Sequence, residues 1–238
     1  MSTRAEALES LERLRAVVGN DFRDPSVRRV FDAAVETLAD LPASDTVFLV
    51  ELLAVNYAKA RERHHEFIVC SPICLVLGRR RAREAVPILC QILVDPNADS
   101  IREDVAAILG DTGDVIGVPF LVRVLSHCEV WVRAKAALSL GRLGDPQVVP
   151  SVIPLLEDEA ATVREAAVEA RAALGGREAC AALIRTLQVD DEPTVRAAAA
   201  EALAECEGDE ATEALERAVA QEADEDVVCA ARESLHQR

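Results

Sequence analysis

The apolar residues in the second half of the chain recur with the spacing of amphipathic helices. Val132, Ala136, Leu140 and Leu143 are separated by three or four residues, and the apolar positions that follow Val118 have the same spacing. Such a pattern places the apolar side chains on one face of a helix. Polar residues, glycine and proline separate one apolar segment from the next, as in turns. The pattern therefore predicts an all-α chain.

The helical pattern repeats about every 31 to 32 residues. The segments 101–114, 132–145, 163–176 and 195–208 align without gaps, and 227–238 continues the series. Each segment is predicted to be the second helix of a helical hairpin. A single hairpin cannot bury its apolar face alone, so we expect successive hairpins to stack along one continuous core.

Three features recur at fixed positions of the repeat. Each second helix opens with an aliphatic residue followed by arginine, at Ile101-Arg102, Val132-Arg133, Val163-Arg164 and Val195-Arg196. A glycine follows twelve residues after the first three aliphatic anchors, at Gly113, Gly144 and Gly175. A helix C-terminus favours a left-handed residue at such a place. Val-Pro pairs at 86–87, 118–119 and 149–150 begin the first helices, where the missing amide proton of proline costs nothing.

These segments resemble the HEAT-like repeat of the family that includes the phycobilisome lyase subunits, whose second helix reads like VRxxAAxALGxLGD. Val132 to Asp145, with the sequence VRAKAALSLGRLGD, is close to that pattern. The resemblance covers roughly residues 82–238 and weakens upstream. It implies a right-handed α-α superhelix, a HEAT-repeat solenoid of about 14 helices, in which the second helices line the concave face.

We expect a single solenoid domain over residues 1–238. Residues 1–43 are interpreted as an N-terminal helical cap with helices near 3–18 and 25–39, residues 44–81 as a divergent repeat, and residues 82–238 as five regular repeats. In the divergent repeat Cys70 replaces the arginine, and Ser71-Pro72 is expected to interrupt the helix. End units need a different outer face, which suits such departures.

The charge of the chain argues against nucleic acid as a partner. The net charge is −16, of which residues 1–100 carry −2 and residues 101–238 carry −14. Nucleic-acid affinity rests largely on lysine and arginine that displace counterions. A HEAT-like DNA glycosylase, which would also need aromatic side chains against DNA, is therefore only a remote alternative for a chain with 3% aromatic residues.

The seven cysteines are scattered and set mostly among apolar helical residues. We interpret them as small core residues of a cytoplasmic protein, because dense cysteine frameworks belong to small secreted domains. The charged N-terminus lacks the apolar stretch of a signal peptide, and the most apolar segment, 67–77, is about half the length of a membrane span. No membrane association is expected.

The sequence carries no recognisable catalytic motif. The phosphate-binding loop, GxSxG, GxGxxG and HExxH patterns are all missing. The pair His65-Glu66 is similar to the iron-binding step of helical-repeat hydroxylases, but it occurs once where that family repeats it. Cys70 and Cys74 lack further metal ligands at suitable spacing. We therefore expect neither a metal nor another cofactor, and favour a binding protein over an enzyme.

Three groups of residues are candidates for contact with a protein partner. The basic run Arg79, Arg80, Arg81 and Arg83 follows Gly78 on a turn between repeats, where it is either an anion-binding patch or a solvated loop. Glu169, Glu201 and Glu233 recur every 32 residues and, widened by Glu165 and Glu205, form either an acidic row that attracts a basic partner or a solvated helix face. Trp131 is either an interface anchor or a packing residue.

The recurring arginines 102, 133, 164 and 196 are interpreted differently, as a structural ladder. We expect them to pair with acidic residues in the loops that precede them, namely Asp99, Glu129, Glu159 and Asp191 or Glu192. The remaining candidates favour a non-enzymatic scaffold that binds a protein partner on the concave helical surface. The family resemblance adds an alternative, a bilin lyase subunit or a chaperone for a chromophore-bearing protein. The oligomeric state is left open.

Overall fold

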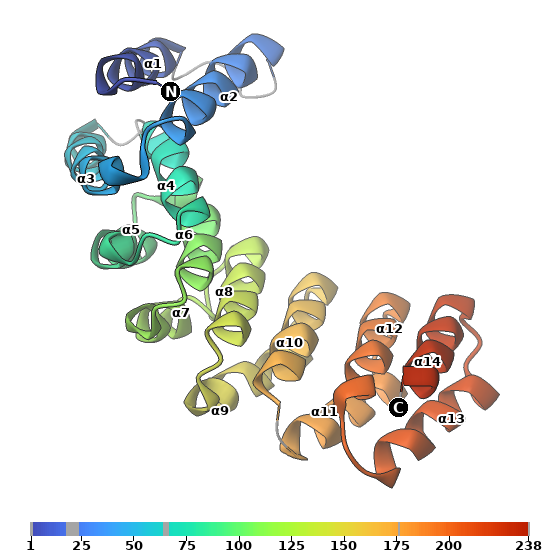
Figure 1. Ribbon diagram of the computed structural model, residues 1–238. Helices are drawn as coiled ribbons and strands as arrows, with labels where there is room; N and C mark the ends of the chain where they lie inside the picture. Colours follow the sequence, from blue (N-terminus) through green and yellow to red (C-terminus); the bar gives the residue numbers. More distant parts are fainter. Residues whose placement is uncertain (1, 18–23, 64–66, 176, 238) are drawn as a thin grey trace. The chain divides into compact units, whose positions relative to one another are not determined.

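The computed structural model describes residues 2–17, 24–63, 67–175 and 177–237, and within these residues it contains 14 α-helices and no strand (Figure 1). In chain order the helices are α1 Arg4–Val17, α2 Pro25–Ala39, α3 Thr46–Arg63, α4 Cys70–Arg79, α5 Val86–Val94, α6 Asp99–Thr112, α7 Val118–Arg123, α8 Val130–Leu143, α9 Val149–Val152, α10 Ala161–Leu174, α11 Arg177–Val189, α12 Pro193–Ala202, α13 Asp209–Gln221 and α14 Glu225–Gln237. Short 3-10 helices connect them, among them η3 Arg83–Ala85, η4 Val115–Gly117, η6 Ile153–Glu157 and η7 Leu203–Glu205. The all-α repeat fold predicted from the sequence is confirmed.

The chain divides into two compact units, Met1–Phe120 and Leu121–Arg238. In the first unit α2, α4 and α6 pack side by side in one layer, and α3 and α5 form a second layer against α4 and α6. In the second unit α8, α10, α12 and α14 form one layer, and α11 and α13 pack against α12 and α14. Each unit is thus a two-layer stack of helical hairpins.

The aliphatic anchors of the repeat hold these layers together. Ile101, Val132, Val163 and Val195 have exposed fractions of 2% or less. The predicted left-handed conformation is confirmed for Gly113 and Gly144, with φ of 67° and 69°. Gly175 also has a positive φ, 65°, but its ψ of −162° is extended. The predicted starts of the first helices at Val86, Val118 and Val149 are also confirmed.

Two prolines change the local helix geometry in different ways. Pro72 lies in the first turn of α4 and does not interrupt the helix, so the expected break at Ser71-Pro72 is wrong. The amide groups of a first turn have no partner within the helix, and proline is tolerated there. Pro154 instead is the second residue after α9, where the chain continues as the 3-10 helix η6. The first helix of this hairpin is therefore only four residues long.

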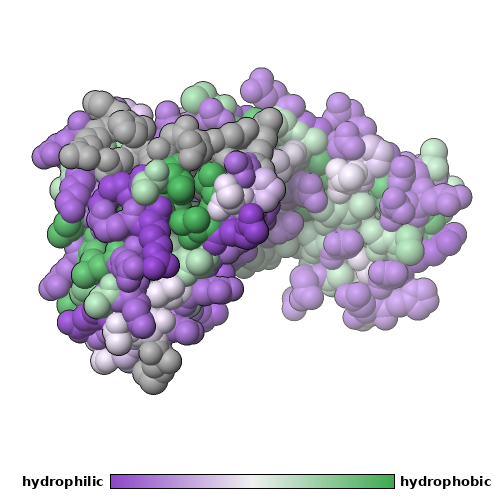
Figure 2. All heavy atoms as spheres, turned by 90° about the horizontal axis from the view of Figure 1, so that it is seen from above, coloured by the Kyte–Doolittle hydropathy of each residue, from purple (hydrophilic) through white to green (hydrophobic). Residues whose placement is uncertain are grey.

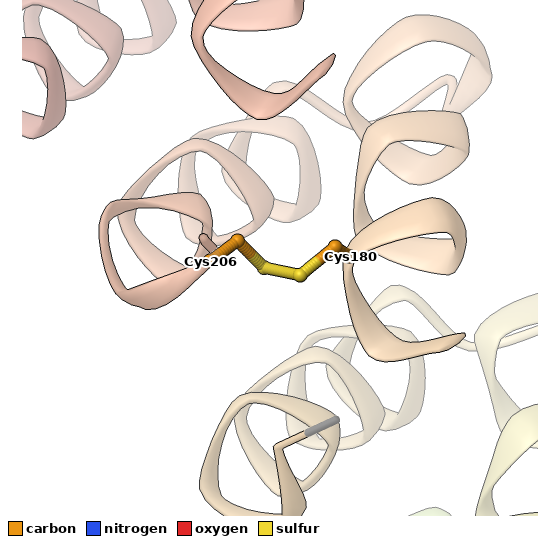
Figure 3. Close-up of a disulfide and its surroundings, with 2 residues drawn as sticks. All are labelled: Cys180 and Cys206. Atoms are coloured by element: carbon orange, nitrogen blue, oxygen red, sulfur yellow. A yellow bond between two sulfur atoms is a disulfide. The ribbon is translucent and has the colours of Figure 1, made fainter. Parts of the chain in front are cut away.

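The cysteines occupy three kinds of environment. Cys70, Cys74 and Cys90 are buried, as expected from the sequence. Cys128 and Cys229 are exposed, so their interpretation as core residues is wrong. Cys180 of α11 and Cys206, which follows η7, form a disulfide with a Cα–Cα distance of 5.7 Å (Figure 3). This bond joins the start of α11 to the end of the following helix and was not predicted.

The surface is mixed in polarity. Figure 2 shows hydrophobic residues reaching the surface in small areas that are separated by hydrophilic residues. The large hydrophobic side chains with the greatest exposure include Val47, Val115, Ile116, Trp131 and Val189. Isolated exposed apolar residues are normal on a soluble surface, so only those that lie beside other functional groups are informative.

Candidate functional site: an acidic surface on the second helices

An arginine ladder fixes the geometry of the second unit. The guanidinium of Arg133 donates two hydrogen bonds to the carboxylate of Asp158, at 2.9 and 2.8 Å. Arg164 contacts Asp190 in the same bidentate manner, at 2.8 Å for both bonds, and Arg196 contacts Glu222 at 3.0 Å for both. Each arginine thereby binds the loop of the hairpin that follows it.

The same arginines also bind the loops that precede them. The Nη1 atom of Arg164 donates to the carbonyl oxygens of Asp158 and Glu159, and Nη1 of Arg196 donates to those of Asp190 and Asp191. The structural ladder is therefore present, but most of its predicted partners were wrong. The preceding loop supplies carbonyl oxygens. The bidentate carboxylate comes instead from a residue 25 or 26 positions downstream of the arginine.

Only one predicted acidic pair of the ladder has the expected form. Arg102 contacts Asp99, and it also donates to the carbonyl oxygens of Leu93 and Asp95. Arg164 does contact Asp191, at 2.6 Å, although this residue was expected beside Arg196. The charges of the ladder arginines of the second unit are thus balanced by Asp158, Asp190 and Glu222. None of these ion pairs involves the predicted row of glutamates on the second helices.

The candidate site is an acidic surface formed by α10, α12 and α14. We define it by Glu165, Glu169, Glu201 and Asp226. Glu165 and Glu169 are one helical turn apart on α10, and Glu201 lies on the adjacent helix α12. A cleft of about 210 Å³ between these helices is lined by Glu165, Glu201 and Asp226 together with Pro193, Thr194, Ala197 and Ala198. The small side chains of Ala197 and Ala198 on α12 thus line the cleft together with the three carboxylates.

The Glu165 carboxyl lies close to the negative charges of Glu169 and Glu201. Burial raises the pKa of the Glu165 carboxyl, and the charges of Glu169 and Glu201 raise it further. No cation contributes to this shift. A raised carboxyl pKa means that the charged form is disfavoured where it stands. A cationic group placed in the cleft would relieve this repulsion.

The structure brings together three of the five predicted glutamates and adds one acidic residue. Glu165, Glu169 and Glu201 interact electrostatically. Glu205 is exposed in η7, and Glu233 of α14 accepts a weak hydrogen bond from Cys229 Sγ at 3.6 Å. Asp226 was missed. It directly precedes the anchor Val227, as Thr194 precedes Val195, and this repeat position could have identified it as a lining residue.

Trp131 occupies the same repeat position as Thr194 and Asp226, one residue before an anchor. It lies at the start of α8, which packs against α10, and its exposed fraction is 54%. Trp131 is thus an exposed side chain in the second-helix layer of the second unit. Large exposed aromatic residues next to charged groups are frequent interface anchors.

The predicted basic run separates into two kinds of residue. The Arg80 guanidinium donates to the carbonyl oxygens of Leu38 and Ala39 at the end of α2, to those of Leu41 and Pro42 just after it, and to Thr46 Oγ1. Arg80 therefore has a structural role. Arg79, Arg81 and Arg83 are exposed, and no ion pair involves them among the described residues.

Neither a metal centre nor a membrane segment emerges from the part of the chain that the structure describes. No group of three or more metal-ligating side chains is found there. None of the described helices combines the length and hydropathy that a membrane span requires. His65 and Glu66, which were compared with the iron-binding step of the hydroxylases, lie outside the described residues.

The family model of HEAT repeats matches residues 118–204 and 162–236, which together cover half of the chain. The chain is a HEAT-repeat protein. No curated protein matches it significantly. Among solved structures, this HEAT-repeat chain is similar to the complex of CpcE and CpcF of phycocyanin lyase from Nostoc sp. PCC7120, with 26% identity, 68% coverage of both chains and a TM-score of 0.54.

Two further solved structures share the HEAT-repeat fold alone. YibA of Escherichia coli is 15% identical with a TM-score of 0.56, and the match covers 100% of this chain and 98% of YibA. An engineered protein is 18% identical with a TM-score of 0.57, and the match covers 95% of this chain and 67% of the engineered one. At this level of identity the likeness identifies the architecture and carries no function.

Proposed function

We propose that this HEAT-repeat protein is a non-enzymatic scaffold that binds a basic segment of a protein partner at the acidic surface of α10, α12 and α14. The observation that carries the proposal is that Glu165, Glu201 and Asp226 line one cleft, in which the charges of Glu169 and Glu201 disfavour the charged form of Glu165. A lysine or arginine side chain that enters this cleft gains the attraction of several carboxylates at once. Trp131 would extend the contact toward α8 as an aromatic anchor.

The surface is suited to peptide rather than to small-molecule recognition. Its cleft of about 210 Å³ is smaller than the roughly 300–1,000 Å³ that is common for ligand pockets, and its lining is acidic. A chain with a net charge of −16 also repels phosphate-rich polymers. Because the attraction is electrostatic, the affinity is expected to fall as the salt concentration rises.

A charge-neutralising variant tests the acidic surface. The triple substitution Glu165→Gln, Glu169→Gln and Glu201→Gln should weaken binding of a fluorescent lysine- and arginine-rich peptide by about tenfold or more, measured by anisotropy. The matched control, Glu207→Gln, Glu213→Gln and Glu216→Gln, removes the same net charge from exposed positions outside the surface. An equal loss in both variants would reduce the effect to overall charge and contradict a defined site.

The expected cytoplasmic location belongs to the same proposal. Disulfides are rare in reducing compartments, so this location requires that Cys180 and Cys206 exchange readily between the bonded and the free state. Alkylation of cysteines in freshly lysed cells, followed by mass spectrometry, measures which state is present. A fully bonded pair throughout the cell would instead favour an oxidising compartment.

A second candidate function follows from the similarity to the phycocyanin lyase complex of CpcE and CpcF. We infer that a related role would be that of a lyase subunit or a chaperone for a chromophore-bearing protein. The supporting observation is the 26% identity over 68% of both chains. Mixing the protein with a free bilin and recording the absorbance spectrum tests this role. An unchanged spectrum, with and without an added second HEAT-repeat chain, would contradict it.

A further inference from the structure

The turn that follows helix α4 contains a residue type that is unusual for its backbone conformation. The backbone N–H of Ala82 donates to the carbonyl oxygen of Leu77 at 3.0 Å, and that of Arg81 donates to Gly78 at 2.8 Å. These two bonds define a Schellman motif, whose left-handed residue is usually glycine. Here it is Arg81, with φ of 50°, the only described non-glycine residue with positive φ. Among the regular repeats, Gly113, Gly144 and Gly175 occupy the same position.

The left-handed conformation of Arg81 has a cost that glycine would avoid. A side chain with a Cβ atom is disfavoured in this region, whereas glycine adopts it readily. Strained backbone residues of this kind cluster at functional sites, so an observed outlier supports a hypothesis of function. The fold needs only the backbone conformation at this position. The outlier therefore directs attention to the exposed side chain of Arg81.

The neighbouring loops present Arg81 together with two more cations and three apolar side chains. Arg80 attaches this loop to Pro42 and to Thr46, the first residue of α3, which Val47 follows. The Nη2 atom of Arg83 lies 3.9 Å from the position that a Cβ on Gly113 would occupy, two residues before Val115. Three successive loops of the first unit thus lie side by side. The charged and large apolar side chains exposed on or beside them are Arg79, Arg81, Arg83, Val47, Val115 and Ile116, with one exposed carboxylate, Glu84, next to Arg83.

The exposure of these residues distinguishes the surface from an ordinary solvated turn. The exposed fractions of Val47, Val115 and Ile116 are 58%, 57% and 57%. Arg79, Arg81 and Arg83 have no ion pair with any described residue. Unpaired cations beside exposed aliphatic side chains fit a ligand that combines negative charge with apolar groups.

We propose that this edge, defined by Arg79, Arg81, Arg83, Val47, Val115 and Ile116, is a second interaction surface, which binds an acidic protein segment that carries aliphatic side chains. Three arginines pair with carboxylates, and the exposed valines and isoleucine bury the aliphatic residues between them. We favour a protein segment over a nucleic acid, because sugars and phosphates offer no aliphatic side chains to the exposed Val47, Val115 and Ile116. Anionic vesicles are distinguished from it by the probes below. The proposal is independent of the acidic surface on the second unit.

Substitution of the strained residue gives a test with two readouts. Arg81→Gly should raise the melting temperature by a few degrees, because glycine adopts the left-handed turn without strain. The same substitution should weaken binding of a fluorescent peptide of glutamates and leucines severalfold. A purely structural Arg81 predicts a lower melting temperature or unchanged binding, and either result would overturn the proposal.

A pair of matched variants tests the surface as a whole. Arg79→Gln with Arg83→Gln should weaken peptide binding about tenfold. The control, Arg28→Gln with Arg29→Gln, removes two exposed arginines from α2 in the same unit and should leave binding unchanged. Val115→Ser with Ile116→Ser should reduce the affinity severalfold without changing its salt dependence.

Three other probes decide between ligand classes. The same peptide with glutamine in place of glutamate should not bind. Phosphatidylserine vesicles and single-stranded DNA should bind more weakly than the acidic peptide at equal salt concentration. Tighter binding of either probe than of the peptide, or an equal loss in the Arg28 and Arg29 control, would overturn the proposal.

Discussion

Asp158 accepts both of its guanidinium hydrogen bonds from Arg133, a residue of the preceding hairpin, and the two side chains are exposed by only 10% and 8%. A bidentate contact between partly desolvated ions is strong, and loss of one partner leaves the other charge without compensation. The pair is therefore a structural connection between successive hairpins.

Arg133→Ala should lower the free energy of unfolding by about 3 kcal/mol, because it removes the cation that pairs with the mostly buried carboxylate of Asp158. Urea denaturation measures the change. The control is Arg185→Ala, which breaks a pair with Glu157 in which both side chains are 72% exposed. Exposed pairs contribute about 0–1 kcal/mol. Equal effects of the two substitutions would contradict a structural role specific to the ladder.

The close approach of α8 and α10 leads to a second prediction. A Cβ added to Gly141 would lie 2.7 Å from the Cα of Ala170, which is backbone and cannot move aside easily. Gly141→Ala should therefore destabilise the protein by about 1–3 kcal/mol through overpacking. Within a helix the same substitution normally stabilises by about 1 kcal/mol. The sign of the change in thermal denaturation decides whether the two helices pack this closely.

The disulfide between Cys180 and Cys206 gives a third prediction. The bond closes a segment of 26 residues, and a loop of that length stabilises the folded state by about 3 kcal/mol through the unfolded chain. Cys206→Ser should show this loss in oxidised protein. The same variant should have little effect once a reductant has opened the bond. The exposed free Cys128 provides the control, since Cys128→Ser should leave stability unchanged.

The carboxylates of the ladder predict loss of stability in acid. Burial is the largest single effect and raises the pKa of Asp158 and of Asp190. The hydrogen bonds and charges of Arg133 and Arg164, together with the backbone N–H groups of Ala160 and Glu192, outweigh it and lower both pKa values. The hydrogen bond from Arg196 lowers the pKa of Glu222. A carboxyl group whose pKa is lower in the folded than in the unfolded state stabilises the fold at pH values above its unfolded pKa, about 4. This contribution is lost as the pH falls through the folded pKa.

The unfolding free energy should therefore fall steeply as the pH decreases below about 4. Arg196→Gln should reduce this dependence, because Glu222 then loses the partner that lowers its pKa. Urea denaturation at a series of pH values measures the slope. A slope that is unchanged in the variant would show that other carboxyl groups control the acid transition.

The repeat period was sufficient to predict most of the architecture. The anchors, the left-handed glycines and the Val-Pro helix starts each follow from local chemistry that recurs at a fixed interval, and all except the left-handed conformation of Gly175 are confirmed. The partners of the ladder arginines were not accessible in the same way. An arginine side chain is long enough to reach either neighbouring loop, and only the three-dimensional stack determines which carboxylate meets it.

Single departures from the pattern were harder to interpret than the pattern itself. Arg171 is fully buried at the repeat position where Leu109, Leu140 and Leu203 form the core. Arg81 replaces glycine, and Asp226 replaces threonine. A comparison of each repeat position across all hairpins would have identified these exceptions. The burial of Arg171 and the positive φ of Arg81 were visible only in the structure, because a residue type fixes neither its burial nor the sign of its φ angle.

The ladder also has a direction along the chain. Arg133, Arg164 and Arg196 each precede their carboxylate by 25 or 26 residues. During synthesis every one of these cations leaves the ribosome before the group that neutralises it. Each of these hairpins is thus stabilised by the loop of the next one. Removal of α13 and α14 would take away Glu222 and leave Arg196 without its carboxylate. A hairpin added after α14 would gain no such ion pair, because Val228 stands at the arginine position.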